Sequence, residues 1–408
     1  MEDYGQLEKI INDTVRQAIE TKQFNFGALI QSMEAEFTQR GFRNPPARGG
    51  VQKILILRLD AIGDFILLSP SIRAIRENFP RAYITLVVTK AVYPMAELCP
   101  YVNEVIVFET PFTSSNSNND VINILMTTTD FSVKRLWRRH FDICFAFLND
   151  PTHCFMGYMS GAKTRVALAG GFSNVLMTHP LPFDEKKLVH WCERNLYLPQ
   201  ACGLTIKSKE LELWIDNEDI VYAKNLLNGF APNRIKIAFG LGANHVERRY
   251  PVEKYLVALK EIIAKGAAIV ILGGSSEVKD AKFLEDNLPN GTVKNITEIR
   301  PGWRVDSAII SLCDMYIGND TGTQHIAATL KKPVIVLSRE SKDRERQFRH
   351  NCEHIMFEPW QTKHITIQPE HQLGECARKL STCWAGKPHC ITQIEPSEIV
   401  AAFVKILK

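Results

Sequence analysis

KILILRLDAIGDFILLSPSIRAIREN, residues 53–78, predicts a buried strand that runs through a short turn into a helix. The apolar run KILILR (53–58) is typical of a strand that is covered on both faces. Residues 64–78 repeat apolar side chains at helical spacing, and Pro70 should bend that helix. A strand followed in this way by a helix is the repeating unit of a parallel α/β domain.

The same alternation of strand and helix extends outward from this stretch in two series. In the first series the further strands are expected at YITLVV (83–88), EVIVFE (104–109) and FDICFAF (141–147). The second series follows ELELWIDNED (210–219), and its strands are expected at RIKIAFG (234–240), AAIVILGG (267–274), DMYIGND (314–320) and PVIVLS (333–338). Helices are expected between these strands at 252–265, 276–287, 304–312 and 321–330. The pattern predicts two doubly wound α/β domains with a cleft between them.

The composition is that of a folded globular protein and excludes several other classes. Of 408 residues, 45% are hydrophobic and 23% are charged, which excludes a largely disordered chain. Lys and Arg number 49 against 45 Asp and Glu, and the net charge of +4 is too small to indicate a nucleic-acid partner. The sequence has no run of about 18 apolar residues and no basic leader before an apolar core. We therefore expect a cytoplasmic protein.

The first 50 residues have a character of their own. Residues 1–43 contain two stretches with apolar side chains at helical spacing, and the turn-rich NPPARGG (44–50) separates them from the first strand. These helices could form an oligomerisation or docking element, or they could pad the domain that follows. Both interpretations stay open at this point.

The turn after the first strand contains the first candidate site residues. Asp64 begins a helix beyond the carboxyl end of a strand, which is where open α/β sheets bind their ligands, and Gly63 would let a substrate approach the backbone. Asp64 could also simply cap the helix, and Asp60 is a second carboxylate in the same turn. The turn lacks the G-x-G-x-x-G pattern of nicotinamide and flavin enzymes.

A second candidate site lies at a helix start in the second series. The expected strand at 314–320 ends in Asp320, Thr321, Gly322 and Thr323, and His325 follows in the first turn of the helix. The free N–H groups and the dipole of a helix N-terminus favour a phosphate, and Gly322 removes a side chain that would block its approach. A capped helix after a strand is also a common structural feature, so the pattern alone leaves both interpretations open.

Two further turns of the second series carry candidate ligands for a nucleotide. Arg248 and Arg249 could grip a diphosphate by charge-assisted hydrogen bonds, although adjacent arginines are often solvated surface residues. Gly273 and Gly274 lie in a glycine-serine turn that could contact a nucleoside or simply connect a strand to a helix. An acid on one domain together with phosphate-binding groups on the other predicts group transfer from a nucleotide-activated donor.

These motifs together resemble glycosyltransferase family 9, the bacterial ADP-heptose:lipopolysaccharide heptosyltransferases and their relatives. The resemblance covers about residues 51–407 and rests on RLDAIGDFILLSPSIRAIRENFPRAYITLVV, GANHVERRYPVEKY, VILGGSSEV and IGNDTGTQHIAATLKKPVIVL in that order. It implies the GT-B fold, in which two Rossmann-like domains face a cleft. The resemblance does not cover the expected helical extension and linker at 1–50. The implied parts are an acceptor-side domain at 51–215, a nucleotide-sugar-binding domain at 216–394, and a final helix at 395–408 that packs back on the first domain.

The resemblance also implies a reaction and the residues that perform it. The reaction is an inverting transfer of heptose or a similar sugar from an ADP-sugar to a lipopolysaccharide core at the inner membrane surface, and it requires no catalytic cofactor. Asp64 matches the family's general base, and Arg248 stands where the family usually has lysine. The family pattern D-T-G-x-x-H matches a set that, with Thr323, would hold the diphosphate and contact the donor sugar: Asp320, Thr321, Gly322 and His325.

Other functions remain compatible with the same residues. A different nucleotide sugar or a protein acceptor would keep the fold and mechanism. A nucleotide-sugar epimerase or hydrolase would turn over the donor without an acceptor. A catalytically silent binding or scaffold protein would keep the motifs without turnover.

Three of the ten cysteines, Cys376, Cys383 and Cys390, are spaced evenly near the end of the chain. Several family members carry four cysteines here, and some of them hold iron, but Leu373 stands where the first cysteine would fall. Three thiolates with one more ligand could form a tetrahedral structural site for iron or zinc, or they could remain free thiols. The fourth ligand could come from Cys352, His371 or His389. The seven scattered cysteines are expected to be mostly buried thiols.

A basic segment and a polar loop of the first series are the last features. The expected helix at 121–140 carries Lys134, Arg135, Arg138 and Arg139 around Trp137. This face could meet anionic lipid headgroups or phosphorylated acceptor sugars, or it could be a solvated surface. The loop at 110–120 is expected to shape the acceptor side.

Overall fold

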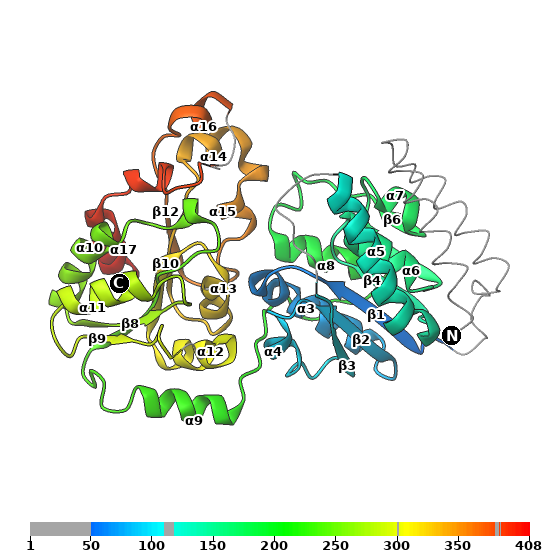
Figure 1. Cartoon of the computed structure of the whole chain (residues 1–408), viewed down its shortest axis with the longest axis horizontal. Helices are drawn as coiled ribbons and strands as arrows, with labels where there is room; N and C mark the ends of the chain where they lie inside the picture. Colours follow the sequence, from blue (N-terminus) through cyan, green and yellow to red (C-terminus); the bar gives the residue numbers. More distant parts are fainter. Residues whose placement is uncertain (1–49, 110–117, 300–301, 380–382, 384) are drawn as a thin grey trace. The chain divides into compact units, whose positions relative to one another are not determined.

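The computed structural model of the chain describes residues 50–109, 118–299, 302–379, 383 and 385–408. Two parallel six-stranded sheets with flanking helices organise these residues (Figure 1). The fold class predicted from the sequence, two doubly wound domains of the GT-B type, is therefore confirmed. The helices expected in residues 1–43 and most of the expected polar loop, residues 110–117, lie outside the described residues.

The first sheet has the strand order β3-β2-β1-β4-β5-β6. Its centre is β1, whose Ile54 pairs in parallel register with Ile84 on one side and Ile143 on the other. The strands are β1 (Lys53–Arg58), β2 (Tyr83–Val88), β3 (Glu104–Val107), β4 (Ile143–Ala146), β5 (Thr164–Leu168) and β6 (His179–Leu181). The helices of this part are α3 (Ile62–Asn78), α4 (Tyr93–Ala96), α5 (Asn118–Arg135), η1 (Trp137–Arg139), α6 (Pro151–Met159), α7 (Ser173–Leu176) and α8 (Trp191–Ala201).

The second sheet has the order β12-β11-β10-β7-β8-β9, which is the same topology as the first. Its strands are β7 (Ile235–Gly240), β8 (Ala267–Leu272), β9 (Val293–Asn295), β10 (Met315–Asn319), β11 (Val334–Leu337) and β12 (His364–Ile367). The helices before β11 are α9 (Asn217–Leu226), η2 (Val246–Arg248), α10 (Val252–Ala264), α11 (Val278–Asn287), α12 (Gly302–Leu312) and α13 (Gly322–Thr329). Those after it are α14 (Lys342–Phe348), η3 (Arg349–Asn351), α15 (Glu353–Met356), α16 (Gly374–Lys379), η4 (Cys390–Gln393) and α17 (Pro396–Ile406).

The described residues fall into two compact units, each with its own apolar core. The second unit contains Ala61–Ser71, Asp184–Leu196 and Ile206–Lys408, and the first contains the remaining described residues. Leu55 and Leu57 of β1 lie fully buried in the first core, and Ile237 and Phe239 of β7 do so in the second. The first turn of α3, which carries Asp64, therefore belongs to the second unit.

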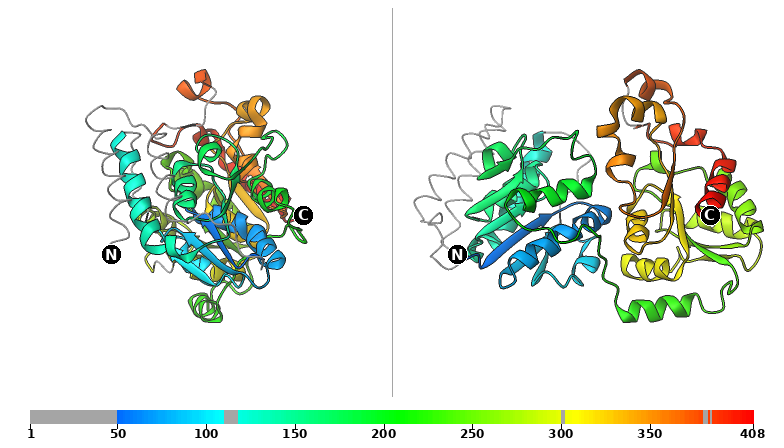
Figure 2. Two further views of the ribbon diagram at one scale, coloured as in Figure 1. Left: turned by 90° about the vertical axis from the view of Figure 1, so that its right-hand side faces the viewer. Right: turned by 180° about the vertical axis from the view of Figure 1, so that it is seen from behind.

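The last helix differs from the expectation. α17 buries Ile399 and Phe403 in the core of the second unit, where the helix packs against α10 and β12. Figures 1 and 2 show this red helix beside the yellow-green α10. The expectation that the final helix packs back on the first domain is wrong, because its apolar face completes the core of the domain that precedes it.

The basic segment of the first unit also differs from the expectation. α5 already includes residues 118–120 and ends at Arg135, and the short 3₁₀ helix η1 follows it. Trp137 is buried in the core, so it does not lie among the exposed basic side chains. No helix among the described residues combines the length and the apolar character needed to cross a bilayer.

Candidate functional site

The centre of the second sheet is the point where its strand order reverses. β7 and β10 are neighbours there, but their chains continue to different parts of the sheet. Turns at such a point separate and leave a crevice beyond the carboxyl ends of the strands, which is where doubly wound sheets bind their ligands. Residues 241–251 follow β7 and residues 320–322 follow β10, so Arg248 and Asp320 both lie in turns at this point of the sheet.

Asn319, the last residue of β10, ties these two turns together. Its side chain is fully buried, and its Nδ2 donates to the carbonyl oxygen of Leu241 at 2.8 Å. Its Oδ1 accepts from the backbone N–H of Tyr250 at 3.2 Å and from the hydroxyl of Tyr255 at 2.9 Å. A buried amide with all these bonds satisfied holds the turn that carries Arg248 against the start of α13.

The start of α13 presents hydroxyl groups and backbone N–H groups together. Thr321 has an extended backbone at the N-cap, and the structure records no capping hydrogen bond from its side chain. Its Oγ1 instead lies 2.8 Å from Oγ1 of Thr323, which is 2.7 Å from the hydroxyl of the buried Tyr316. The positive end of the helix is therefore left to another negative group.

Arg248 extends from η2 toward this helix start. Its Nη1 donates to the carbonyl oxygen of Asp320 at 3.3 Å and lies 3.9 Å from Asp320 Oδ2, and its Nη2 donates to Glu353 Oε2 at 2.9 Å. Burial lowers the pKa of Arg248, but the carboxylates of Asp320, Glu353 and Glu340 outweigh it and raise the pKa. The guanidinium stays charged and is held in place, as a phosphate ligand must be.

The two other polar residues of the D-T-G-x-x-H pattern are buried. Burial raises the pKa of Asp320, whose Oδ1 accepts from Nε2 of Gln324 at 2.6 Å. Burial, together with the charges of His190 and Arg248, lowers the pKa of His325 to about 3. His325 is therefore neutral at pH 7, and its ring lies in the site without a charge.

Arg249 and the glycine-serine turn lie together on a different side of the turn after β7. Arg249 Nε donates to the carbonyl oxygen of Ala243 at 2.9 Å, and its Nη2 lies 3.1 Å from Oε1 of the buried Glu277. Glu277 Oε2 accepts from the backbone N–H of Gly274 at 2.8 Å, and a Cβ on Gly273 would lie 3.0 Å from Cβ of Glu277. The structure does not bring the guanidiniums of Arg248 and Arg249 to one point. The Arg248 guanidinium contacts Asp320 just before α13, and the Arg249 guanidinium pairs with Glu277.

Asp64 lies half-buried in the first turn of α3, as the sequence predicted. Within the second unit this turn approaches the start of α13 closely. A Cβ on Gly63 would lie 2.7 Å from Cδ2 of His325, and a Cβ on Gly322 would collide with the side chain of Ile62. The two glycines are therefore required for the close packing of these two turns.

The other carboxylate of this turn has a structural role. Asp60 Oδ1 lies 2.8 Å from Nε of the fully buried Arg58. The structure thus pairs Asp60 with Arg58.

A dyad in the first unit supports the residues just before this turn, and the sequence analysis missed it. His153 Nε2 accepts from the backbone N–H of Leu59 at 3.0 Å, and its Nδ1 lies 2.6 Å from Asp150 Oδ2. Asp150 is the N-cap of α6, so its position before a helix was the only local signal. His153 and Leu59 are 94 positions apart in the sequence, so no local sequence motif could have predicted this contact.

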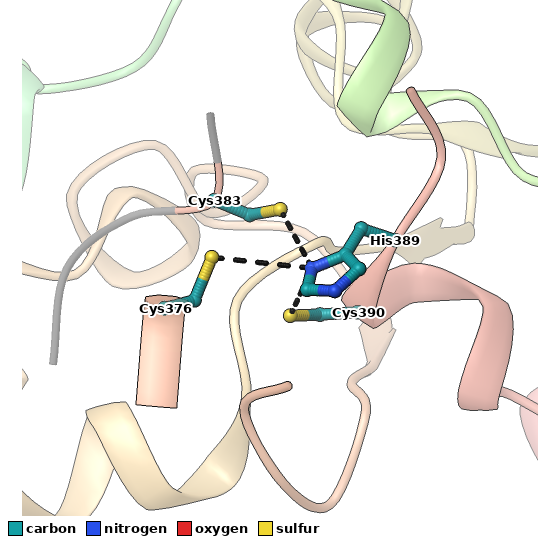
Figure 3. A group of neighbouring side chains, drawn as sticks. All are labelled: Cys376, Cys383, His389 and Cys390. Carbon is teal, nitrogen blue, oxygen red and sulfur yellow. Dashed lines mark hydrogen bonds between the residues drawn. The ribbon is translucent and has the colours of Figure 1, made fainter. Parts of the chain in front are cut away.

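The cysteine cluster, which we define as Cys376, Cys383, His389 and Cys390, has the geometry of a metal centre. The four ligand atoms lie within 4.8 Å of one another (Figure 3). His389 Nδ1 is 3.4 Å from Sγ of Cys383 and of Cys390, and 3.9 Å from Sγ of Cys376. An ion about 2.3 Å from each sulfur and about 2.05 Å from the nitrogen would place those atoms about 3.5 Å apart in a tetrahedron.

The surroundings of the cluster suit thiolates bound to a cation. The backbone N–H of Leu373 donates to Cys390 Sγ at 3.4 Å, a bond that favours a charged sulfur. Burial and the neighbouring thiols raise the pKa of Cys390 to about 12, and a bound metal ion deprotonates such a thiol outright. Of the three fourth ligands considered, the structure supplies His389. Cys352 donates instead to the carbonyl oxygen of Phe348, and His371 pairs with Asp343.

The predicted basic face forms a hollow of about 410 Å³ in the first unit. Its lining residues are Val133, Lys134, Arg135, Arg138 and Arg139. Lys134 pairs with Asp130 at 2.6 Å, and Arg139 pairs with both carboxylate oxygens of Glu104. Two of the four charges are thus partly neutralised by neighbours.

Comparison with known proteins agrees with this description. A sequence model of glycosyltransferase family 9 (heptosyltransferase) matches residues 132–381, more than half of the chain. Lipopolysaccharide heptosyltransferase 2 of Escherichia coli is 20% identical over 295 residues, which cover 70% of this chain and 82% of that protein.

Two solved structures share the fold. A family 9 glycosyltransferase from Veillonella parvula superposes with a TM-score of 0.68 at 17% identity, over 89% of this chain and 99% of its own. Escherichia coli heptosyltransferase WaaC, solved with ADP, has a TM-score of 0.59 at 13% identity, over 87% of this chain and 97% of its own. The match of the family model shows that the chain is a glycosyltransferase and belongs to glycosyltransferase family 9, the heptosyltransferase family.

Proposed function

We propose that this enzyme transfers a heptose, with inversion, from an ADP-sugar to a sugar of the lipopolysaccharide core. The observation that carries the proposal is the meeting of the charged Arg248 and the uncapped start of α13 where the second sheet reverses its strand order. A nucleoside diphosphate fits this combination of a guanidinium and a helix N-terminus. The ADP in the WaaC structure and the lipopolysaccharide acceptor named for the E. coli relative support the choice of substrates.

In the proposed reaction Asp64 is the general base. Its carboxylate accepts the proton of an acceptor hydroxyl while that oxygen attacks the anomeric carbon of the donor. The bond from that carbon to the diphosphate oxygen breaks on the opposite face, and ADP leaves. Arg248 and the N–H groups at 322–323 stabilise the negative charge that develops on the diphosphate, which is usually a large part of such catalysis. Asp320 and His325 would contact the donor sugar.

We propose further that the cysteine cluster holds a structural zinc or iron ion. A closed set of three thiolates and one imidazole is typical of a structural site, because no position is left for a substrate. Elemental analysis of the purified protein should find about one equivalent of metal, and Cys383→Ser should lose it. Protein purified under reducing conditions without metal and with an unchanged melting temperature would contradict this assignment.

Binding of the donor nucleotide is the first test of the catalytic proposal. ADP at 100 times its dissociation constant should stabilise the protein by about 2.7 kcal/mol, which scanning fluorimetry detects as a higher melting temperature. UDP, GDP and CMP at the same concentration should have little effect. A shift with UDP alone would discard ADP-heptose, and no shift with any nucleotide would contradict the donor site.

Single substitutions then separate binding from chemistry. Asp64→Asn should lower kcat about 10²–10⁴-fold and leave the dissociation constant of ADP nearly unchanged, because a base acts in the transition state. Arg248→Met should weaken ADP binding and also lower kcat, while Arg248→Lys should retain part of both. Arg346→Met is the matched control, because it removes an exposed arginine of the same unit that pairs with Asp343. Transfer by Asp64→Asn at the wild-type rate would contradict the assigned base.

A further inference from the structure

The cysteine cluster lies against the turn that carries Arg248. Gly386, which falls between Cys383 and His389 in the sequence, donates its backbone N–H to Glu247 Oε1 at 2.8 Å. Glu247 is buried and immediately precedes Arg248. The 3₁₀ helix η4, which begins at Cys390, also contacts η2, which ends at Arg248. The backbone of the phosphate-binding turn is thus fixed directly by the segment that carries the metal ligands.

A second connection reaches the guanidinium of Arg248 itself. Arg339 Nη1 donates to the carbonyl oxygen of Cys383 at 3.1 Å. Its Nη2 donates to Glu353 at 3.1 Å from Oε1 and 2.8 Å from Oε2. Glu353 Oε2 then accepts from Arg248 Nη2 at 2.9 Å. Three groups, one carbonyl and two charged side chains, therefore link a metal ligand to the donor site.

Burial makes the hydrogen bonds of Arg339 costly to break. The side chain of Arg339 is only 1% exposed, and a guanidinium buried so deeply is stable only when its hydrogen bonds are satisfied. Glu353 is shared between two arginines, so its position depends on both of them. If the carbonyl of Cys383 moved, Arg339 would lose a partner, and the carboxylate that orients Arg248 would shift with it.

We infer that the cysteine cluster controls donor binding, because the occupied cluster holds Cys383 and Gly386 where they orient Arg248 through Arg339, Glu353 and Glu247. Arg339 and Glu353 are positioning residues and do not contact the donor. The inference rests on the proposed function in two respects, that the cysteine cluster holds a metal ion and that the ligand of Arg248 is a diphosphate. Since the ligand atoms must gather around the ion, the positions of Cys383 and His389 depend on metal binding.

Calorimetric titration with ADP and with adenosine tests the inference on the full-length protein. Removal of the metal by a chelator should weaken ADP binding about 10-fold, within the range of about 5–150-fold that is typical of coupled sites. Adenosine binding should change less than about 2-fold, because adenosine has no phosphate for Arg248. A loss that is equal for both ligands would mean general loosening of the domain and would overturn the inference.

Substitution of the positioning residues tests whether the coupling passes through Arg339 and Glu353. Arg339→Met and Glu353→Gln should retain the metal by elemental analysis but weaken ADP binding about 10-fold, and chelation should then add less than about 2-fold, because the route is already broken. Glu353→Gln preserves the shape of the side chain, which guards against a folding failure of Arg339→Met. Arg304→Gln on α12, which breaks a charged pair with Asp219 of α9, should leave both effects unchanged. Full and equal chelation effects in wild type, Arg339→Met and Glu353→Gln would overturn the inference.

Hydrogen–deuterium exchange provides a readout that does not depend on the donor assignment. The backbone N–H of Arg248 donates to the carbonyl oxygen of His245 at 3.0 Å, and that of Arg249 donates to the carbonyl oxygen of Val246 at 3.1 Å. Chelation should accelerate exchange at these two amides in wild type. If ADP failed to bind the metal-loaded protein while exchange responded in this way, the proposed donor would be wrong and the coupling would stand. Unchanged exchange would overturn the coupling.

Discussion

At the scale of single residues, His153 shows how a long-range contact supports a turn next to a candidate site residue. It connects Asp150 at the start of α6 to the backbone of Leu59, which precedes the turn containing Asp64. Burial works against the charge of Asp150. The nearby His153 and the hydrogen bonds from the backbone N–H groups of His153 and Thr152 nevertheless lower its pKa to about 2. The dyad therefore depends on an ionised Asp150.

This dyad predicts an acid-dependent loss of stability. Because the pKa of Asp150 is lower in the folded state than the usual value of about 3.9, its contribution is present above pH 4 and is lost as the pH falls toward 2. The side chain is 39% exposed, so after allowance for screening we expect Asp150→Asn to cost only about 1 kcal/mol at pH 7.

Urea unfolding of wild type and Asp150→Asn at several pH values measures this contribution. The difference between the two free energies of unfolding should be constant from pH 5 to 7 and should shrink below pH 4. Asp130→Asn, which breaks an exposed pair with Lys134, is the control and should have a smaller effect. A difference that did not change with pH would contradict the role of the ionised carboxylate.

At the scale of secondary-structure elements, α17 shows that an amphipathic pattern predicts a buried helix face but not the domain against which that face packs. The helix begins at Pro396, and the side chain of Glu398 accepts from the backbone N–H of Glu395 at 2.8 Å. These local features were visible in the sequence, and so was the apolar face. The face could have covered either domain, and packing against α10 places it in the second.

This packing predicts a clear contrast between two neighbouring positions. Phe403 is 1% exposed and Val404 is 37% exposed. Phe403→Ala should lower the free energy of unfolding by about 3–5 kcal/mol, because it leaves a cavity in the core. Val404→Ala should change it by no more than about 0.5 kcal/mol. Similar losses from the two substitutions in urea unfolding would mean that α17 does not pack as described.

At the scale of the whole molecule, the two sheets share one topology but carry different polar residues at the carboxyl ends of their strands. The first presents the turn supported by His153, and the second presents Arg248 and the start of α13. Since each sheet has its own core, ligand binding to the second need not stiffen the interior of the first.

This division predicts where ADP should protect the chain. Hydrogen–deuterium exchange should slow at 241–249 and 320–325 when ADP binds, because these turns would hold the diphosphate. The buried strands of the first sheet, such as β1 and β4, should exchange as they do without ligand. Protection at β1 and β4 comparable to that at 320–325 would contradict the assignment of the donor to the second sheet.

The sequence by itself determined the features that depend on neighbouring residues. Buried strands such as 53–58, the glycine turn at Gly63 and the helix start at Asp320–Thr323 follow from apolar runs, backbone freedom and helix polarity. These are local properties, and the structure has each element where it was expected. The alternation of the elements was enough to predict two parallel sheets.

Only the tertiary structure decided which distant groups meet. It directed Arg248 and Arg249 to different partners, selected His389 as the companion of the three cysteines, and placed Glu353 between two arginines. The residues that join Cys383 to Arg248 come from segments 44 and 105 positions apart. Such contacts depend on how whole elements pack and on which buried charges must be paired, and no local pattern records either.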